Sequence, residues 1–198
     1  MICAIILAAG RSRRMGAQKV LLPFAGRTVI GHIAGEILRS PVGQTLVVVG
    51  QDAARIAEAL GGRPVTLVTN PDPGGEMLSS VRCGLRAIPQ DCEAVLVALG
   101  DQPTITADLV GRMIEVYRAW GRGIVVPVYG GKSGHPVLFS ARYRQEILTR
   151  YDDVGLRGLR RAHPDDVFEL GEADPSVLGD MDYPEDYRRE LEKFPGDG

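Results

Sequence analysis

Residues 3–19 read C-A-I-I-L-A-A-G-R-S-R-R-M-G-A-Q-K, and this stretch decides the fold. Its beginning, residues 3–7, is a continuous apolar run, which is typical of a parallel strand buried on both faces. The small residues and glycines that follow allow successive backbone N–H groups to approach an anion. The arginines of residues 11–14 repel one another beside a buried strand end unless an anion neutralises them. We therefore predict that residues 7–19 form a phosphate-binding loop, with a solvated basic turn as the alternative.

The loop differs from two widespread phosphate-binding motifs. No Gly-Lys followed by Ser or Thr ends it, as a Walker A loop requires, and it lacks the G-x-G-x-x-G of dinucleotide-binding domains. Arg14 and Lys19 add mobile positive charge to its backbone. A dehydrogenase domain of the Rossmann type is therefore disfavoured.

Strand and helix patterns alternate along the chain, which predicts an α/β fold. We expect a three-layer α/β/α, Rossmann-like sandwich around a mostly parallel sheet. The sheet should be mixed, because the short connection at residues 130–136 can join only antiparallel strands. Strands are predicted at residues 3–7, 46–49, 65–68, 94–99, 124–128, 137–139 and 167–170, and helices at residues 28–38, 53–60, 77–88, 106–120 and 184–194, with two further helical patterns before the last strand.

The clearest helix pattern spans residues 106–120. Thr106 offers a side-chain N-cap at its start. An apolar stripe along one face predicts packing against the sheet. The residues of the stripe are Leu109, Val110, Met113, Val116, Tyr117 and Trp120.

The composition fits one domain that spans residues 1–198. A net charge of -2 favours neither a nucleic-acid partner nor a membrane surface. No apolar stretch reaches the ~20 residues that a membrane helix needs, and arginines follow the first apolar run instead of preceding it as in a signal peptide. The three cysteines lack C-x-x-C spacing and indicate a reducing compartment. We expect a cytoplasmic protein.

Three unusual loops, at residues 8–19, 70–76 and 100–103, each follow a predicted strand. Ligands of open parallel sheets bind at the carboxyl ends of the strands, so these loops should gather at one edge. Asp101, directly after a buried strand, suits a hard cation such as Mg²⁺. An Asx-type turn is the alternative for this residue.

The motif L-A-A-G-x-S-x-R-M-G-x-x-K at residues 7–19, followed by Leu21-Leu22-Pro23, resembles the opening of the molybdenum cofactor nucleotidyltransferases. The resemblance extends to about residue 187. It implies a fold of the nucleotide-diphospho-sugar transferase type and a loop that wraps a nucleoside triphosphate. It also implies catalytic roles for Arg14 and Lys19, which would hold the phosphates and stabilise charge at the α-phosphorus. The nucleotide-binding residues implied in this loop are Leu7, Ala8, Ala9, Gly10, Arg11, Ser12, Met15 and Gly16.

The resemblance implies a Mg²⁺ site made by two aspartates. G-D-Q-P at residues 100–103 is typical of the cytidylyltransferase branch, in which the residue matching Asp101 binds the metal and serves catalysis. D-M-D-Y-P-E-D at residues 180–186 resembles the late D-x-D-T-P-E-D segment and implies Asp182 as the other ligand. Tyr183 replaces the usual threonine there. From the residues alone, acidic side chains at this point equally suit the N-terminus of a helix.

Two further groups of residues complete the implied site. Family members recognise the base with the region that holds Asn70, Gly74, Gly75, Ser79 and Ser80. Gly100, at the next strand end, is a further implied nucleotide-binding residue. For the serines, simple helix capping is the alternative. G-H-P at residues 134–136 lies beside the acceptor pocket in the cytidylyltransferase branch, whereas His32 and His163 are predicted to be structural. The substrate-binding residues so implied are Gln102, Pro103, Gly134, His135 and Pro136.

The resemblance implies Mg²⁺-dependent transfer of CMP from CTP to the terminal phosphate of molybdopterin, with release of pyrophosphate. Such a phosphate is largely ionised at pH 7, so no strong general base is needed. GTP is the second choice of nucleotide, and another phosphorylated acceptor is a further alternative. A non-enzymatic alternative is a nucleotide-binding chaperone that delivers the cofactor. A molybdoenzyme or its chaperone would then be a partner.

Overall fold

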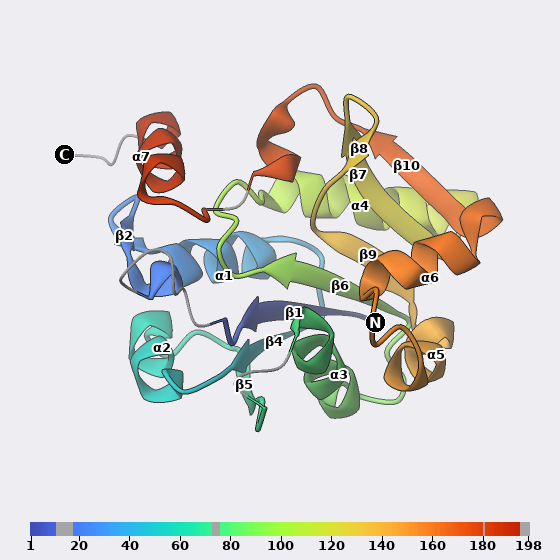
Figure 1. Cartoon of the computed structure of the whole chain (residues 1–198), viewed down its shortest axis with the longest axis horizontal. Helices are drawn as coiled ribbons and strands as arrows, with labels where there is room; N and C mark the ends of the chain where they lie inside the picture. The colour runs from blue at the N-terminus through green and yellow to red at the C-terminus, as the bar shows by residue number, and fades with distance from the viewer. Residues whose placement is uncertain (11–17, 73–75, 180, 195–198) are drawn as a thin grey trace.

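The structure, a computed structural model, describes residues 1–10, 18–72, 76–179 and 181–194 (Figure 1). Its strands are β1 (Ile2–Ala8), β2 (Pro23–Phe24), β3 (Arg27–Thr28), β4 (Gln44–Val49), β5 (Thr66–Thr69), β6 (Ala94–Leu99), β7 (Ile124–Tyr129), β8 (Lys132–Ser133), β9 (Val137–Ser140) and β10 (Val167–Gly171). In the described ranges, an eight-stranded sheet has the order β10-β7-β9-β6-β1-β4-β5, and β8 pairs with β7. β2 and β3 form a separate ribbon.

β1 lies in the middle of a sheet that is mostly parallel. It runs parallel to β4 and to β6, so that Ile5 faces Leu46 on one side and Val97 on the other. β5 extends the sheet parallel to β4, and β10 runs parallel to β7. β9 runs antiparallel to both β6 and β7. The antiparallel pairing predicted from the short connection before β9 is therefore confirmed.

Helices cover both faces of the sheet, which confirms the predicted three-layer sandwich (Figure 1). They are α1 (Val29–Arg39), α2 (Ala53–Leu60), α3 (Met77–Ala87), α4 (Ala107–Trp120), α5 (Arg144–Thr149), α6 (Leu156–Ala162) and α7 (Pro184–Lys193). Alternate residues of β1 serve the two layers, because strand side chains point to opposite faces. Ile6 packs in the cluster of α1 and α4, whereas Ile5 packs in that of α3, α5 and α6. A Cβ on Gly84 of α3 would lie 2.7 Å from Ile5 Cγ2, so glycine is required for this close packing.

α4 follows its sequence pattern at the start and departs from it at the end. Thr106 caps the helix, since its Oγ1 accepts a hydrogen bond from the backbone N–H of Leu109 at 3.1 Å. Leu109 and Met113 are buried as expected. Trp120 is 67% exposed, so its predicted burial is wrong. Trp120 lies at the last turn of α4, where its ring contacts Phe168 of β10 with 5.5 Å between the ring centroids.

The carboxyl ends of β1, β4, β5 and β6 meet at one edge of the sheet. Gly100, just after β6, donates its backbone N–H to Leu7 of β1 at 2.9 Å, and Asn70, after β5, donates to Val49 of β4 at 2.8 Å. In Figure 1 the arrowheads of β1 and β6 point to the same side. The described parts of the three predicted loops therefore gather as expected. Among the described helices, none has both the length and the apolar character to span a membrane.

Candidate functional site

The first loop leaves β1 at this edge, and its two ends lie close together. Gln18 donates from Nε2 to the carbonyl oxygen of Gly10 at 3.1 Å and to Oδ2 of Asp52 at 3.0 Å. A Cβ at Gly100 would lie 2.6 Å from the carbonyl oxygen of Leu7, so glycine is required where β6 leaves the sheet beside β1. The predicted residues between these ends, Arg11, Ser12, Arg14, Met15 and Gly16, lie outside the described residues.

Lys19 begins a 3-10 helix, η1 (Lys19–Leu21), and its side chain joins the two aspartates of the predicted metal site. Its Nζ pairs with the carboxylate of Asp101 and with Oδ1 of Asp182, the latter at 3.0 Å. Burial opposes the charge on Lys19, but Asp101 and then Asp182 outweigh it and raise the pKa of the ammonium above its ordinary value. Lys19 is thus a half-buried, charged link between segments that are far apart in the sequence.

The two aspartates fit a hard divalent cation, and the Lys19 ammonium already holds a cation's place between them. No group of three or more His, Cys, Asp or Glu side chains in the described ranges forms a metal cluster. The protein would therefore supply two carboxylates and leave other positions to phosphate oxygens and water, which is the usual arrangement for Mg²⁺ at phosphate sites. Two carboxylates alone therefore suit a divalent cation that binds together with a phosphate-containing substrate.

In the acidic segment before α7, the two predicted roles, metal binding and capping of the helix, fall on different residues. Asp182 faces Lys19, whereas Asp186 accepts the backbone N–H of Tyr183 at 2.9 Å and so caps α7. The backbone N–H of Met181, which is fully buried, donates to the carbonyl oxygen of Asp101 at 3.3 Å. The helix-start alternative is therefore right for Asp186 and does not account for Asp182. Tyr183 is 53% exposed.

The predicted acceptor loop, residues 134–136, is hydrogen-bonded to the 3-10 helix η4 (Pro175–Leu178). His135 donates its backbone N–H to the carbonyl oxygen of Val177 at 3.0 Å, just before a cis peptide bond to Pro136. Gln102 is buried and also donates to Val177, from Nε2 at 2.8 Å. Its Oε1 is buried without a hydrogen-bond partner among the described residues. Gln102 and residues 134–136 are thus held by the same carbonyl group, that of Val177.

The charges of Asp101 and of two arginines of α6, Arg157 and Arg160, act on the ring of His135. Burial lowers the pKa of His135 to about 4; Asp101 opposes this shift, and Arg160 and Arg157 add to it. His135 is therefore neutral at pH 7. His163 contacts Glu146 at 3.0 Å instead, in keeping with the structural role expected of it.

Arg157, which is exposed, and Arg160, which is half-buried, are two further candidate residues that the sequence analysis did not single out. Burial, followed by the charge of Arg157, lowers the pKa of Arg160. Neither arginine forms a hydrogen bond or ion pair with another described residue. Glu169 offsets part of the lowering of the Arg160 pKa, and an anion bound beside Arg160 would offset more of it. The only sequence signal was the i, i+3 spacing of the two on one helix.

The predicted base-recognition residues come together through hydrogen bonds among themselves. Asn70 is buried, and its Nδ2 donates to Oγ of Ser79 at 2.9 Å and to Oγ of Ser80 at 3.0 Å. α3 already begins at Met77, and its N-cap, Glu76, makes no side-chain capping bond. The capping alternative for the serines is therefore wrong. Gly74 and Gly75 lie outside the described residues.

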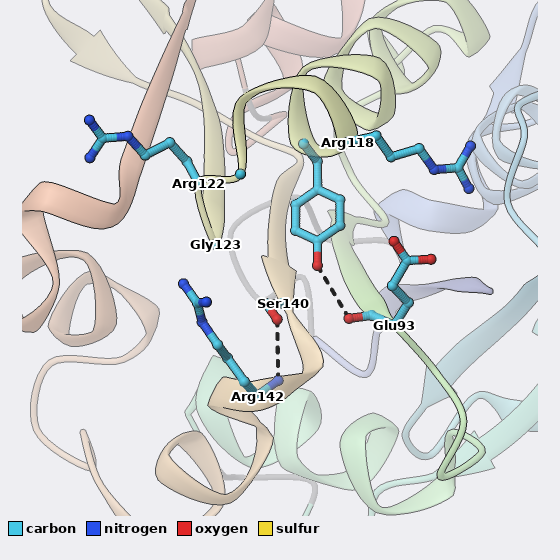
Figure 2. Close-up of a pocket in the computed structure, with 8 residues that line it drawn as sticks. Glu93, Arg118, Arg122, Gly123, Ser140 and Arg142 are labelled. Atoms are coloured by element: carbon cyan, nitrogen blue, oxygen red, sulfur yellow. Dashed lines mark hydrogen bonds between the residues drawn. The ribbon is translucent and has the colours of Figure 1, made fainter.

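A pocket of about 220 Å³ lies at the opposite edge of the sheet (Figure 2). It is lined by residues next to the amino ends of β6 and β7, including Glu93 and Gly123. Figure 2 shows the hydroxyl of Tyr117 hydrogen-bonded to the backbone of Glu93. Arg142 on its wall is already paired with Asp166. This pocket is separate from the Lys19, Asp101 and Asp182 cluster.

Comparison with known proteins agrees with this arrangement. The MobA-like NTP transferase domain matches residues 4–167. The molybdenum cofactor cytidylyltransferase of Escherichia coli (strain K12) is 25% identical over 194 residues, which cover 98% of this chain and 97% of that protein. The nicotine blue oxidoreductase of Paenarthrobacter nicotinovorans is 30% identical over 199 residues, covering 96% of both.

Solved structures have the same fold. The crystal structure of Rv0371c from Mycobacterium tuberculosis H37Rv has a TM-score of 0.84 at 30% identity, covering 96% of this chain and 97% of that one. Its complex with manganese has a TM-score of 0.79 at 28% identity, covering 96% and 98%. The sheet order and these likenesses identify the nucleotide-diphospho-sugar transferase fold. The chain is a nucleotidyltransferase and belongs to the family of MobA-like NTP transferases.

Proposed function

We propose that this enzyme transfers CMP from CTP to the terminal phosphate of a molybdopterin-type acceptor and releases pyrophosphate, with Mg²⁺ as the cofactor. The proposal rests on one observation: Lys19 forms ion pairs with Asp101 and Asp182 at the carboxyl edge of β1 and β6. The loop of residues 7–19, which begins at the same edge, would hold the triphosphate. Similarity over nearly the whole length to a protein named molybdenum cofactor cytidylyltransferase supports the choice of reaction.

Catalysis in this proposal rests on charge and alignment. Lys19, together with Arg14, would offset negative charge on the phosphates during transfer. Asp101 and Asp182 would hold the divalent cation, which supplies further positive charge at the α-phosphate. The acceptor phosphate is already largely ionised at pH 7 and attacks without a strong base. A neutral His135 agrees with this, since its role is then to contact the acceptor.

The surroundings of His135 support an anionic acceptor. Arg157 and Arg160 bring two positive charges to this side of Asp101, and no described residue pairs with them. Guanidinium groups bind phosphate oxygens with two parallel hydrogen bonds. The acceptor's phosphate would therefore lie between α6 and the metal site.

The choice of CTP over GTP rests on the sequence spellings L-A-A-G, G-D-Q-P and G-H-P. The buried Asn70 holds the hydroxyl groups of Ser79 and Ser80 close to the carboxyl edge. These hydroxyl groups, which still have their own O–H to donate, are the groups that we assign to the base. GTP remains the runner-up. Binding of CTP and GTP in the presence of Mg²⁺, measured by calorimetry, separates them, and tighter GTP binding would rule out the CTP assignment.

A second candidate is an oxidoreductase, because one relative over the full length carries that activity in its name. Two assays on the same preparation distinguish the candidates. Pyrophosphate release from CTP with a molybdopterin acceptor supports nucleotidyl transfer. Reduction of a dye acceptor without any pyrophosphate would support the oxidoreductase instead. Nucleotide binding without either turnover would support a cofactor-delivery chaperone.

The pyrophosphate assay also tests the metal assignment. Asp101→Asn and Asp182→Asn should each abolish most turnover. Glu185→Gln is the matched control, since Glu185 is an exposed carboxylate of the same acidic segment. Full turnover in both aspartate variants would refute the metal site.

A further inference from the structure

The Lys19 side chain is the feature that carries a further inference. Its ammonium pairs with Asp101 and with Asp182, which lie in loops on either side of it. Only 14% of the Lys19 side chain and 20% of that of Asp101 are exposed, so water screens this ion pair incompletely. The two ion pairs therefore hold the ammonium between the carboxylates.

Two carboxylates that face one point repel each other unless a cation lies between them. Lys19 is that cation in the structure. A divalent cation bound by the same two groups would face the Lys19 ammonium at close range, and the like charges would repel. This repulsion favours an exchange of the two cations at the carboxylates.

We propose that Lys19 is a built-in substitute for the divalent cation, which holds Asp101 and Asp182 in place until the metal binds and then moves to the phosphates of the nucleotide. The second half of this step rests on the proposed function. As a consequence, metal and nucleotide should bind cooperatively, because a triphosphate that attracts Lys19 leaves the aspartates open to the metal. By linkage the metal should strengthen nucleotide binding by the same factor.

The local backbone allows such a movement of the side chain alone. Residue 19 is fixed at the start of η1, where Leu22 donates its N–H to the carbonyl oxygen of Lys19 at 3.2 Å. The preceding loop, the proposed triphosphate cradle, is closed at its base by the hydrogen bond between Gln18 and Gly10. The flexible four-carbon stem of lysine lets the ammonium leave the aspartates while the backbone of η1 stays in place.

The first test measures Mn²⁺ binding by electron paramagnetic resonance on the intact, nucleotide-free protein. Lys19→Met removes the ammonium and keeps the length of the side chain, so Mn²⁺ should bind at least several-fold more tightly, because no ammonium then competes for the two carboxylates. Lys132→Met is the control, because Lys132 is exposed on β8 and changes the net charge equally. Unchanged or weaker Mn²⁺ binding in Lys19→Met would overturn the proposal.

A second test uses the wild-type protein and so does not depend on the folding of a variant. The chain has three lysines, Lys19, Lys132 and Lys193, whose acetylation by acetic anhydride can be followed separately by mass spectrometry. Mn²⁺ alone should increase acetylation of Lys19 several-fold relative to the other two. No change at Lys19 at a saturating Mn²⁺ concentration would overturn the proposal.

Addition of CTP separates this inference from the proposed function. If both hold, CTP should protect Lys19 from acetylation in the presence of Mn²⁺. If Mn²⁺ exposes Lys19 but CTP has no effect, Lys19 still substitutes for the cation, and the assignment of a triphosphate to this loop fails.

Discussion

Replacement of Gly134 by alanine tests how the acceptor loop is seated. A Cβ at this position would lie 2.0 Å from the carbonyl oxygen of Val177 in η4, and real Cβ atoms do not approach closer than 3.0 Å. The loop and η4 must therefore separate by about 1 Å. The backbone at Gly134 is not in the left-handed region, so the effect is one of space alone.

The magnitude follows from the contacts that this separation breaks. Val177 accepts hydrogen bonds from His135 at 3.0 Å and from Gln102 at 2.8 Å, and each is worth about 1 kcal/mol. Overpacking adds roughly 1–3 kcal/mol. We expect a loss of about 3 kcal/mol in the free energy of unfolding, which for a chain of this size lowers Tm by roughly 6–12 °C. A shift of about 1 Å beside the reacting groups should also lower kcat/KM for the acceptor about 100-fold.

The assay combines thermal unfolding with the kinetics of pyrophosphate release. Gly111→Ala is the matched control, because a Cβ on this glycine of α4 meets nothing within 4 Å and should raise stability by up to about 1 kcal/mol. The KM for CTP should change little in Gly134→Ala. A variant that melts and turns over like the wild type would refute the claim that the loop rests tightly on Val177.

Three further outcomes are expected. Asp101→Asn and Asp182→Asn should each lower kcat/KM for pyrophosphate release at least ~100-fold, with Glu185→Gln unchanged, because each removes a ligand of the divalent cation that would stabilise charge on the phosphates. Arg160→Gln should raise KM for the acceptor about tenfold and leave KM for CTP unchanged, since it removes a charge-assisted hydrogen bond; equal effects on both substrates would place Arg160 elsewhere. The pKa of His135 is about 4 in the folded state and ordinary when unfolded, so the unfolded state binds more protons as pH falls below 6.5, and wild-type stability should decline by up to ~3 kcal/mol toward pH 4. Denaturant titrations should find this decline smaller in His135→Gln, where His32, whose pKa is also lowered by burial, still contributes.

The central strands β1, β4 and β6 were predictable because each is an apolar run that must be buried on both faces. The run at β1 and the short connection before β9 were enough to predict a mixed, mostly parallel sheet and the edge at which Asp101 lies. Local chemistry also predicted the cap at Thr106, since an N-cap depends only on its own helix.

The remaining features depend on contacts between distant segments. Arg157 and Arg160 look like the solvated face of an ordinary helix until α6 is packed beside His135. Gln102 was predicted to bind substrate, yet its amide N–H groups point to the carbonyl oxygens of Ser176 and Val177, and only Oε1 is left for a ligand. Trp120 fits the helical period but lies at the last turn of α4, where no further sheet covers it in the described structure. No local pattern contains this information.

The segment after β10, which includes Val177, Met181 and Asp182, contacts both the proposed acceptor loop and the proposed metal site. Through Val177 it supports both Gln102 and His135, and through Met181 it is hydrogen-bonded to Asp101. It then supplies Asp182, the second carboxylate that faces Lys19. A displacement of this one segment would therefore disturb the acceptor loop and the metal site at the same time. Binding of acceptor against His135 and of metal against Asp182 should consequently reinforce each other, because each fixes the segment on which the other depends.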